Sequence, residues 1–130
     1  MKNKQEKIFW HITKTENLQN IKKYGIKANE DNEVFLLDNK EVTIKCKCDK
    51  PFLVSKAVAL EQLFLTEFVI FAVDVTGLKL EPDDVAELTS PFQYIYKGDI
   101  KPNRIKGYEF DTTEDYQQQI KEFQQKLFKK

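Results

Sequence analysis

The chain has 130 residues, 41% of them hydrophobic, which is enough to build the core of one domain without disulfides or metals. Lysines and arginines together number 21, as do aspartates and glutamates, and the zero net charge excludes a general attraction to nucleic acid or anionic lipid. The only arginine is Arg104, which argues against a dedicated phosphate-binding protein, because such proteins favour the bidentate guanidinium group.

The first part of the chain predicts a strand, a helix and a second strand. Residues 7–12 are apolar and aromatic and are expected to form the first strand. Thr13 is expected to cap the following helix, with Glu16 at the capping-box spacing. Gly25 fits the position after the helix, where the backbone needs a positive φ. Residues 34–37 then predict a buried second strand.

The middle of the chain predicts a hairpin arm, a helix and the main strand. Apolar and polar residues alternate over 42–46, which indicates a strand or one arm of a hairpin. Ser55 is placed to cap a helix that runs to Leu65. Residues 68–75 are nearly all β-branched or aromatic, so we expect a central strand there.

The last part of the chain predicts two strands and a terminal helix. Residues 92–96 are expected to form a strand with Phe92, Tyr94 and Tyr96 on one face, and 105–110 the last strand. Asp111 is placed to open a helix whose apolar stripe consists of Tyr116, Ile120, Phe123 and Leu127. The elements predict one soluble α+β domain over 1–130. We expect it in the cytoplasm, because no signal peptide or membrane-spanning run is found.

His11 is the only histidine and lies near the end of the first predicted strand. His11 and Thr13 are two residues apart, so on a strand their side chains share a face. The start of the following helix offers free N–H groups and a dipole that favour an anionic ligand. A structural histidine held by a hydrogen bond is the alternative interpretation of the same pattern.

A series of short motifs follows in a particular order along the chain: Trp10-His11-Ile12-Thr13, Tyr24-Gly25-Ile26, Val73-Asp74-Val75-x-Gly77-Leu78, and Tyr94-Ile95-Tyr96-x-Gly98-Asp99-Ile100-x-Pro102. This order resembles the ADP-ribosyltransferase-like domains, a group that includes DNA-targeting ADP-ribosyltransferase toxins and RNA 2′-phosphotransferases. The resemblance covers most of residues 8–110. The phosphotransferase branch fits poorly, since its members bind phosphate with several arginines.

The resemblance implies a fold and a chemistry. The fold would be a small, twisted, mostly antiparallel split β-sheet with flanking helices and a C-terminal helix. The chemistry would be binding of NAD as a substrate and transfer of its ADP-ribose to a protein or nucleic-acid acceptor. By this resemblance, His11 would hold the ribose of NAD, Thr13 would help to position it, and Phe35 would lie near the nicotinamide.

The catalytic glutamate of that family aligns with Gln93 in this chain. Cleavage of the bond to nicotinamide builds positive charge on the ribose, which a carboxylate stabilises and a neutral amide does not. Losing such a group often costs about 3 kcal/mol or more in the barrier. The enzyme would then be slow, or another acid (Glu67 or Glu87) would substitute. Otherwise the domain has lost catalysis and acts as a protein-binding module or inhibitor.

Further alternatives stay open from the residues alone. Gln93 is also consistent with a solvent-facing position on an edge strand, and the chain with a small α+β domain that has no nucleotide site. Cys46 and Cys48 are interpreted as reduced thiols, because a closed zinc site needs about four ligands. Asp83 and Asp84 lie in an acidic stretch that lacks the spacing of a calcium loop, so we expect no metal site.

Overall fold

The computed structural model describes residues 7–45, 51–83 and 92–128, so Cys46, Cys48, Asp84 and Glu87 lie outside the described residues. The elements in chain order are β1 (Ile8–Thr13), η1 (Thr15–Asn17), α1 (Leu18–Tyr24), β2 (Glu33–Leu37), β3 (Thr43–Lys45), β4 (Pro51–Leu53), α2 (Val54–Ala57), η2 (Val58–Gln62), β5 (Glu67–Asp74), β6 (Leu80–Pro82), β7 (Gln93–Lys97), η3 (Pro102–Arg104), β8 (Ile105–Thr112) and α3 (Glu114–Phe128).

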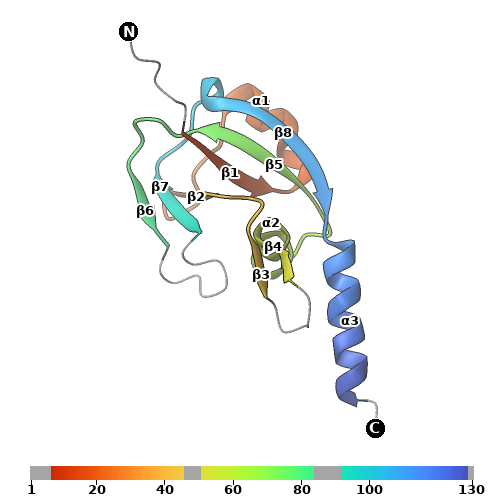
Figure 1. The fold of residues 1–130 in the computed structure, drawn as a ribbon. Helices are drawn as coiled ribbons and strands as arrows, with labels where there is room; N and C mark the ends of the chain where they lie inside the picture. The colour runs from red at the N-terminus through yellow and green to blue at the C-terminus, as the bar shows by residue number, and fades with distance from the viewer. Residues whose placement is uncertain (1–6, 46–50, 84–91, 129–130) are drawn as a thin grey trace.

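Six strands form one sheet in the order β6-β7-β2-β1-β5-β8, and β3 and β4 form a separate hairpin (Figure 1). Every neighbouring pair recorded among these strands is antiparallel. The protein is therefore a mixed α/β structure with a six-stranded antiparallel sheet and a C-terminal helix, as the sequence predicts at this level. The hairpin confirms the strand expected near residues 42–46.

The number of paired residues differs between neighbouring strands of the sheet. β1 pairs with β5 along all six of its residues and β2 pairs with β7 along five. Between β1 and β2, in contrast, the register contains one pair, Trp10 with Leu37. The two three-stranded halves, β6-β7-β2 and β1-β5-β8, consequently meet at one paired position and diverge beyond it.

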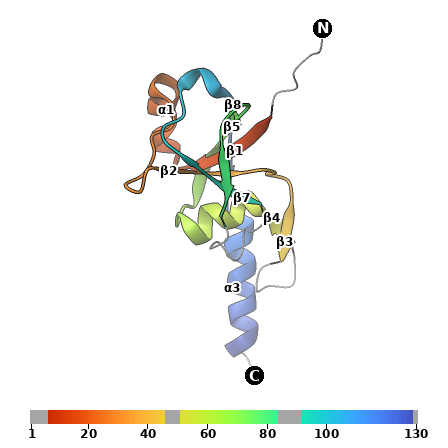
Figure 2. The ribbon, with the colours of Figure 1, turned by 90° about the vertical axis from the view of Figure 1, so that its left-hand side faces the viewer.

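The two faces of the sheet carry separate cores, because successive side chains on a strand point to opposite faces. The core on the α1 face contains Phe9, Leu36 and Phe71, together with Ile21 of α1. The core on the other face contains residues of β1, β2 and β5 and, from α2 and η2, Val54, Val58 and Ala59. Figure 2 shows α1 and α2 on opposite sides of the sheet.

Three predicted helix starts are wrong. In each case the expected capping residue is instead paired in a strand or buried inside a helix. Thr13 remains in β1, paired with Val69, and the helical turn begins at Thr15 without a side-chain cap. Ser55 lies inside α2, where its hydroxyl is buried without a hydrogen-bond partner. Asp111 remains in β8, paired with Phe68, so α3 begins three residues later.

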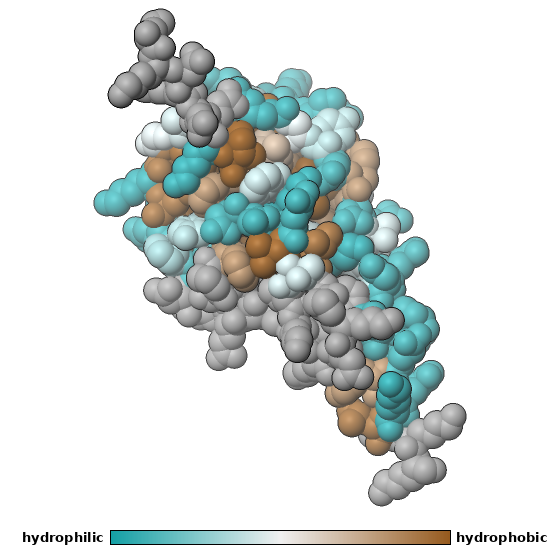
Figure 3. Space-filling model, in the orientation of Figure 1, coloured by the Kyte–Doolittle hydropathy of each residue, from teal (hydrophilic) through white to brown (hydrophobic). Residues whose placement is uncertain are grey.

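Helix α3 leaves the sheet at the end of β8 and extends away from it (Figure 1). Its first turns are anchored by Tyr116, which is fully buried against Ala57. The predicted apolar stripe becomes more exposed along the helix, and Leu127 is 60% exposed. Figure 3 shows this apolar surface in brown near the free end of α3.

Candidate functional site

His11 lies where β1 and β2 begin to diverge. It is the residue after Trp10, the position at which the two strands pair, and its half-buried ring reaches across to β2. The Nδ1 atom of His11 lies 2.9 Å from the main-chain carbonyl oxygen of Phe35. A carbonyl oxygen can only accept, so Nδ1 is the protonated nitrogen and donates this bond.

Burial lowers the pKa of His11 below its ordinary value of 6.5, and the hydrogen bond to the Phe35 carbonyl offsets this only in part. The imidazole is therefore neutral at physiological pH. In the neutral ring only one nitrogen carries a proton, which leaves Nε2 as a hydrogen-bond acceptor. A structural role for this histidine explains the hydrogen bond of Nδ1, and Nε2 can still accept a hydrogen bond from a ligand.

Thr13 lies on the same face of β1 as His11, as the spacing predicts. Its partner Val69 and the His11 partner Phe71 both belong to the core on the α1 face. The side-chain amide of Asn17 donates to Thr13 Oγ1 at 2.7 Å. The hydroxyl thus takes a bond from the turn that follows the strand, while its own proton remains able to donate.

Gln93 is buried on an interior strand, so the interpretation as a solvent-facing edge residue is wrong. Strand β7 lies between β6 and β2, and Gln93 is only 2% exposed. The side-chain Nε2 of Gln93 donates to Asp83 Oδ2 at 2.7 Å, and the main-chain amide of Asp83 donates to the main-chain carbonyl oxygen of Gln93. Asp83 is itself 7% exposed. A buried carboxylate therefore accompanies the amide at the position of the expected glutamate.

The four predicted site residues do not share one face of the sheet. Gln93 is paired with Leu37, which belongs to the core on the α2 face, and Phe35 lies two residues from Leu37 on β2. His11 and Thr13 point to the α1 face. The structure therefore brings His11 to the main chain of Phe35, whose ring is 36% exposed on the other side.

Asp83 is the residue of this region that sequence reasoning missed as a partner of Gln93. The sequence signal was weak: Asp83 lies in the acidic stretch ten residues before Gln93, and the pairing of β6 with β7 brings the two together. Of the two acids proposed as substitutes, Glu67 alternates with Val69 along β5 and lies on the α1 face, with His11 and Thr13. Glu67 is exposed and lines a hollow of about 490 Å³ with Phe110, among other residues.

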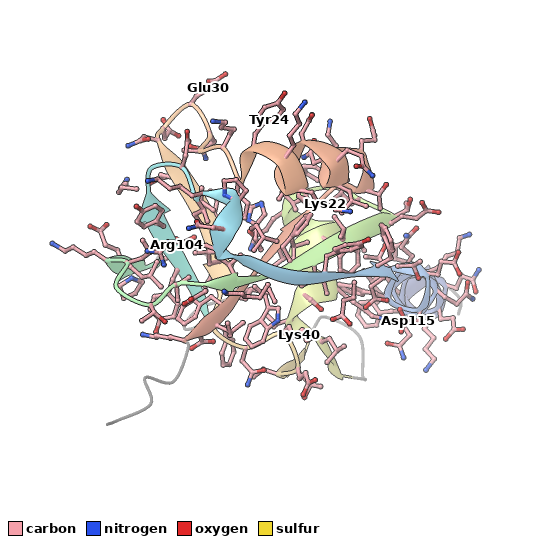
Figure 4. All side chains as sticks on the ribbon, turned by 90° about the horizontal axis from the view of Figure 1, so that it is seen from above. Lys22, Tyr24, Glu30, Lys40, Arg104 and Asp115 are labelled. Atoms are coloured by element: carbon pink, nitrogen blue, oxygen red, sulfur yellow. The ribbon has the colours of Figure 1, made fainter. Side chains whose placement is uncertain are left out.

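Arg104 is engaged in holding the backbone. Its Nη1 donates to the carbonyl oxygens of Asp74 and Thr76, at 3.0 and 2.9 Å. Figure 4 shows Arg104 where β8 begins, at the opposite end of that strand from Asp115 of α3. This guanidinium ties the turn after β5 to the start of β8, which agrees with the sequence-based argument against an arginine-dependent phosphate site.

Comparison with known proteins leaves the family open: no protein-family model matches the sequence, and no curated protein matches it. Within the described ranges, no group of three or more histidine, cysteine, aspartate or glutamate side chains is arranged to hold a metal ion. Over the same residues, no helix combines the length and apolar character needed to cross a membrane.

Proposed function

We propose that this chain is an ADP-ribosyltransferase-like protein that binds NAD beside His11 and Thr13. The observation that carries the proposal is the placement of the histidine: its Nδ1 is bonded to the Phe35 carbonyl oxygen beside the single pair that joins β1 to β2, and this bond leaves Nε2 as an acceptor. A ribose hydroxyl can donate to Nε2. The Thr13 hydroxyl, two residues away on the same face, can donate to a second sugar oxygen.

In an active enzyme of this type, a nucleophile on the acceptor forms a bond to the ribose carbon while the bond to nicotinamide breaks. The ribose then carries positive charge that a nearby carboxylate stabilises. Gln93 cannot supply a negative charge, and its amide is committed to Asp83. Glu67 is a described acid on the same face as His11, and we propose it for this role if turnover is measurable.

A second candidate function is favoured by the buried pair of Gln93 and Asp83. An interior amide bonded to a buried carboxylate is a well-satisfied structural element, and it lies on the face opposite His11. This arrangement supports a catalytically reduced member of the group that serves as a protein-binding module or inhibitor. Such a protein retains ligand binding at His11 and releases little or no nicotinamide.

Calorimetry with NAD tests the binding proposal. Wild-type protein should bind NAD, and His11→Ala should abolish the heat while keeping a cooperative unfolding transition. Lys14→Gln is the matched control, because Lys14 is exposed directly after β1 and its extended backbone continues the alternation that puts it on the opposite face from His11 and Thr13. The absence of any heat with wild-type protein, or equal heats for His11→Ala and wild type, would refute NAD binding at this position.

Nicotinamide release distinguishes the two functions. Gln93→Glu alone would place a carboxyl beside Asp83, where two like charges raise the pKa of one of them. The double variant Gln93→Glu/Asp83→Asn exchanges the two groups and keeps one acid and one amide. A large gain in release over the single Asp83→Asn control supports a lapsed enzyme. An unchanged rate, with NAD still bound, supports the binding module.

A further inference from the structure

A second hollow lies on the α1 face of the sheet, at the start of β1 and away from His11. Its volume is about 510 Å³, within the range of small-molecule sites. It is formed where β1, β6 and β7 meet the turn after β5, and its lining residues are Lys7, Phe9, Asp38, Leu78, Lys79, Leu80 and Tyr94. The site residues proposed above do not line it.

The charges of this hollow are unbalanced. Two lysines, Lys7 and Lys79, meet a single carboxylate, that of Asp38. Both lysines are exposed, so their ammonium groups are accessible from solvent. The Lys7 ammonium lies 5.3 Å from the centre of the Phe9 ring, and the Lys7 main chain is held by bonds to Thr76 and Val75. The lining therefore carries one net positive charge, and both ammonium groups are available to an anion.

Asp38 gives the hollow a second requirement. Its Oδ1 is buried and has no hydrogen-bond partner, although a buried carboxylate oxygen is normally paired. Burial is also the main cause that raises the pKa of this carboxyl above its ordinary value, against the opposing effects of its own amide and Lys7. Because Asp38 lines the hollow, a ligand with an N–H or O–H group facing it would give this carboxylate a hydrogen-bond partner.

Aromatic rings form part of the wall. Phe9 and Tyr94 pack edge to face, with ring centres 5.3 Å apart. Tyr94 is only half-buried, so part of it remains for a ligand to contact. A phosphate group carries nearly two charges at neutral pH, and lysines bind it as point charges. The chemistry required is thus a group with anionic oxygens at one end and a hydrogen-bond donor at the other.

We infer that this hollow binds a small organic phosphate that carries a hydrogen-bond donor, with Lys7 and Lys79 holding the phosphate and Asp38 accepting from the donor. The site is separate from the one proposed at His11, and neither depends on the other. A sugar phosphate and a nucleoside monophosphate share the required chemistry. The aromatic wall favours the nucleoside monophosphate, since a base can pack against Tyr94.

The test is a titration of the full chain with AMP, ribose 5-phosphate and inorganic phosphate, followed by calorimetry and by NMR shifts of the Phe9 and Tyr94 amides. AMP should bind most tightly and inorganic phosphate least. Lys79→Gln should weaken AMP binding about tenfold, the usual effect of losing one bond to a charged group. The control Lys14→Gln should leave it unchanged.

His11→Ala separates this proposal from the proposed function. It should leave AMP binding in the hollow intact even if it abolishes NAD binding. Three results would overturn the inference: no binding of any probe at millimolar concentration, equal binding of inorganic phosphate and AMP, or equal AMP affinities for Lys79→Gln and Lys14→Gln. Loss of AMP binding in His11→Ala would likewise place the ligand elsewhere.

Discussion

Replacing Gly25 with alanine should be among the most damaging small changes in this protein. Gly25 ends α1 with φ 82° and ψ −172°, a combination that is almost confined to glycine. A methyl group there would overlap the main-chain carbonyl oxygen of Ile100 and crowd the nitrogen of Pro102. That same carbonyl accepts from the Ile26 amide at 2.8 Å, and the Ile100 amide donates back to Ile26 at 2.8 Å.

The cost follows from these two effects. The backbone conformation alone costs about 1–3 kcal/mol for a residue with a side chain. Moving the Ile100 carbonyl away weakens two hydrogen bonds, each of which contributes about 1 kcal/mol. Gly25→Ala should therefore lower the free energy of unfolding by about 3–5 kcal/mol, which is a large part of the roughly 5–15 kcal/mol typical of a domain.

Urea denaturation of three glycine variants separates the two contributions. Gly77 also has a positive φ, 83°, but an added methyl group would meet nothing within 4 Å, so Gly77→Ala should cost about 1 kcal/mol. Gly107 has no such backbone constraint and equally open surroundings, so its variant should be near neutral. Equal urea midpoints for Gly25→Ala and Gly77→Ala would refute the argument that the Ile100 carbonyl dominates.

Three further predictions concern stability. The pKa of His11 is lowered in the folded state, so the stability gained from the neutral ring is complete above pH 6.5 and is lost as the pH falls towards the folded-state pKa. Between pH 7.5 and 5.5, the urea midpoint should therefore fall less steeply for His11→Gln than for wild type. Phe64 is 83% exposed with φ 58°, so Phe64→Gly should stabilise by about 1 kcal/mol in the same assay, whereas Leu63→Gly, at a negative φ, should not. Tyr116→Ala should cost about 3 kcal/mol or more and Leu127→Ala less than about 0.5, since only the first is buried; similar midpoints would contradict this account of how α3 is anchored.

The strands were more predictable than the helix starts. Apart from Asp74, residues 68–75 are apolar on both faces, and β5 lies between two neighbouring strands with a core on each side. The positive φ predicted at Gly25 is confirmed, because the end of a helix imposes it locally. Thr13 and Asp111 have the chemistry of helix caps, but pairing with β5 keeps both in strands, and this long-range effect is not visible in a local pattern.

The candidate site was predictable only in part, for a similar reason. Alternation along one strand places His11 and Thr13 together, and the structure agrees. The relative faces of Phe35 and Gln93 depend on the register between strands that are distant in the sequence. The hydrogen bond between Gln93 and Asp83 depends on the pairing of β6 with β7, which no motif in the chain predicts.

The single pair between β1 and β2 also determines where the sheet should open first. One pair, Trp10 with Leu37, joins β1 to β2, and the His11 ring adds a bond to the Phe35 carbonyl, so local separation of the two strands requires breaking few main-chain bonds. Amide protons there should exchange with solvent through small fluctuations, while those between β1 and β5 should exchange only when the whole domain unfolds. A molecule bound between the two halves would either promote or suppress this separation. Faster or slower amide exchange between β1 and β2 would distinguish the two effects.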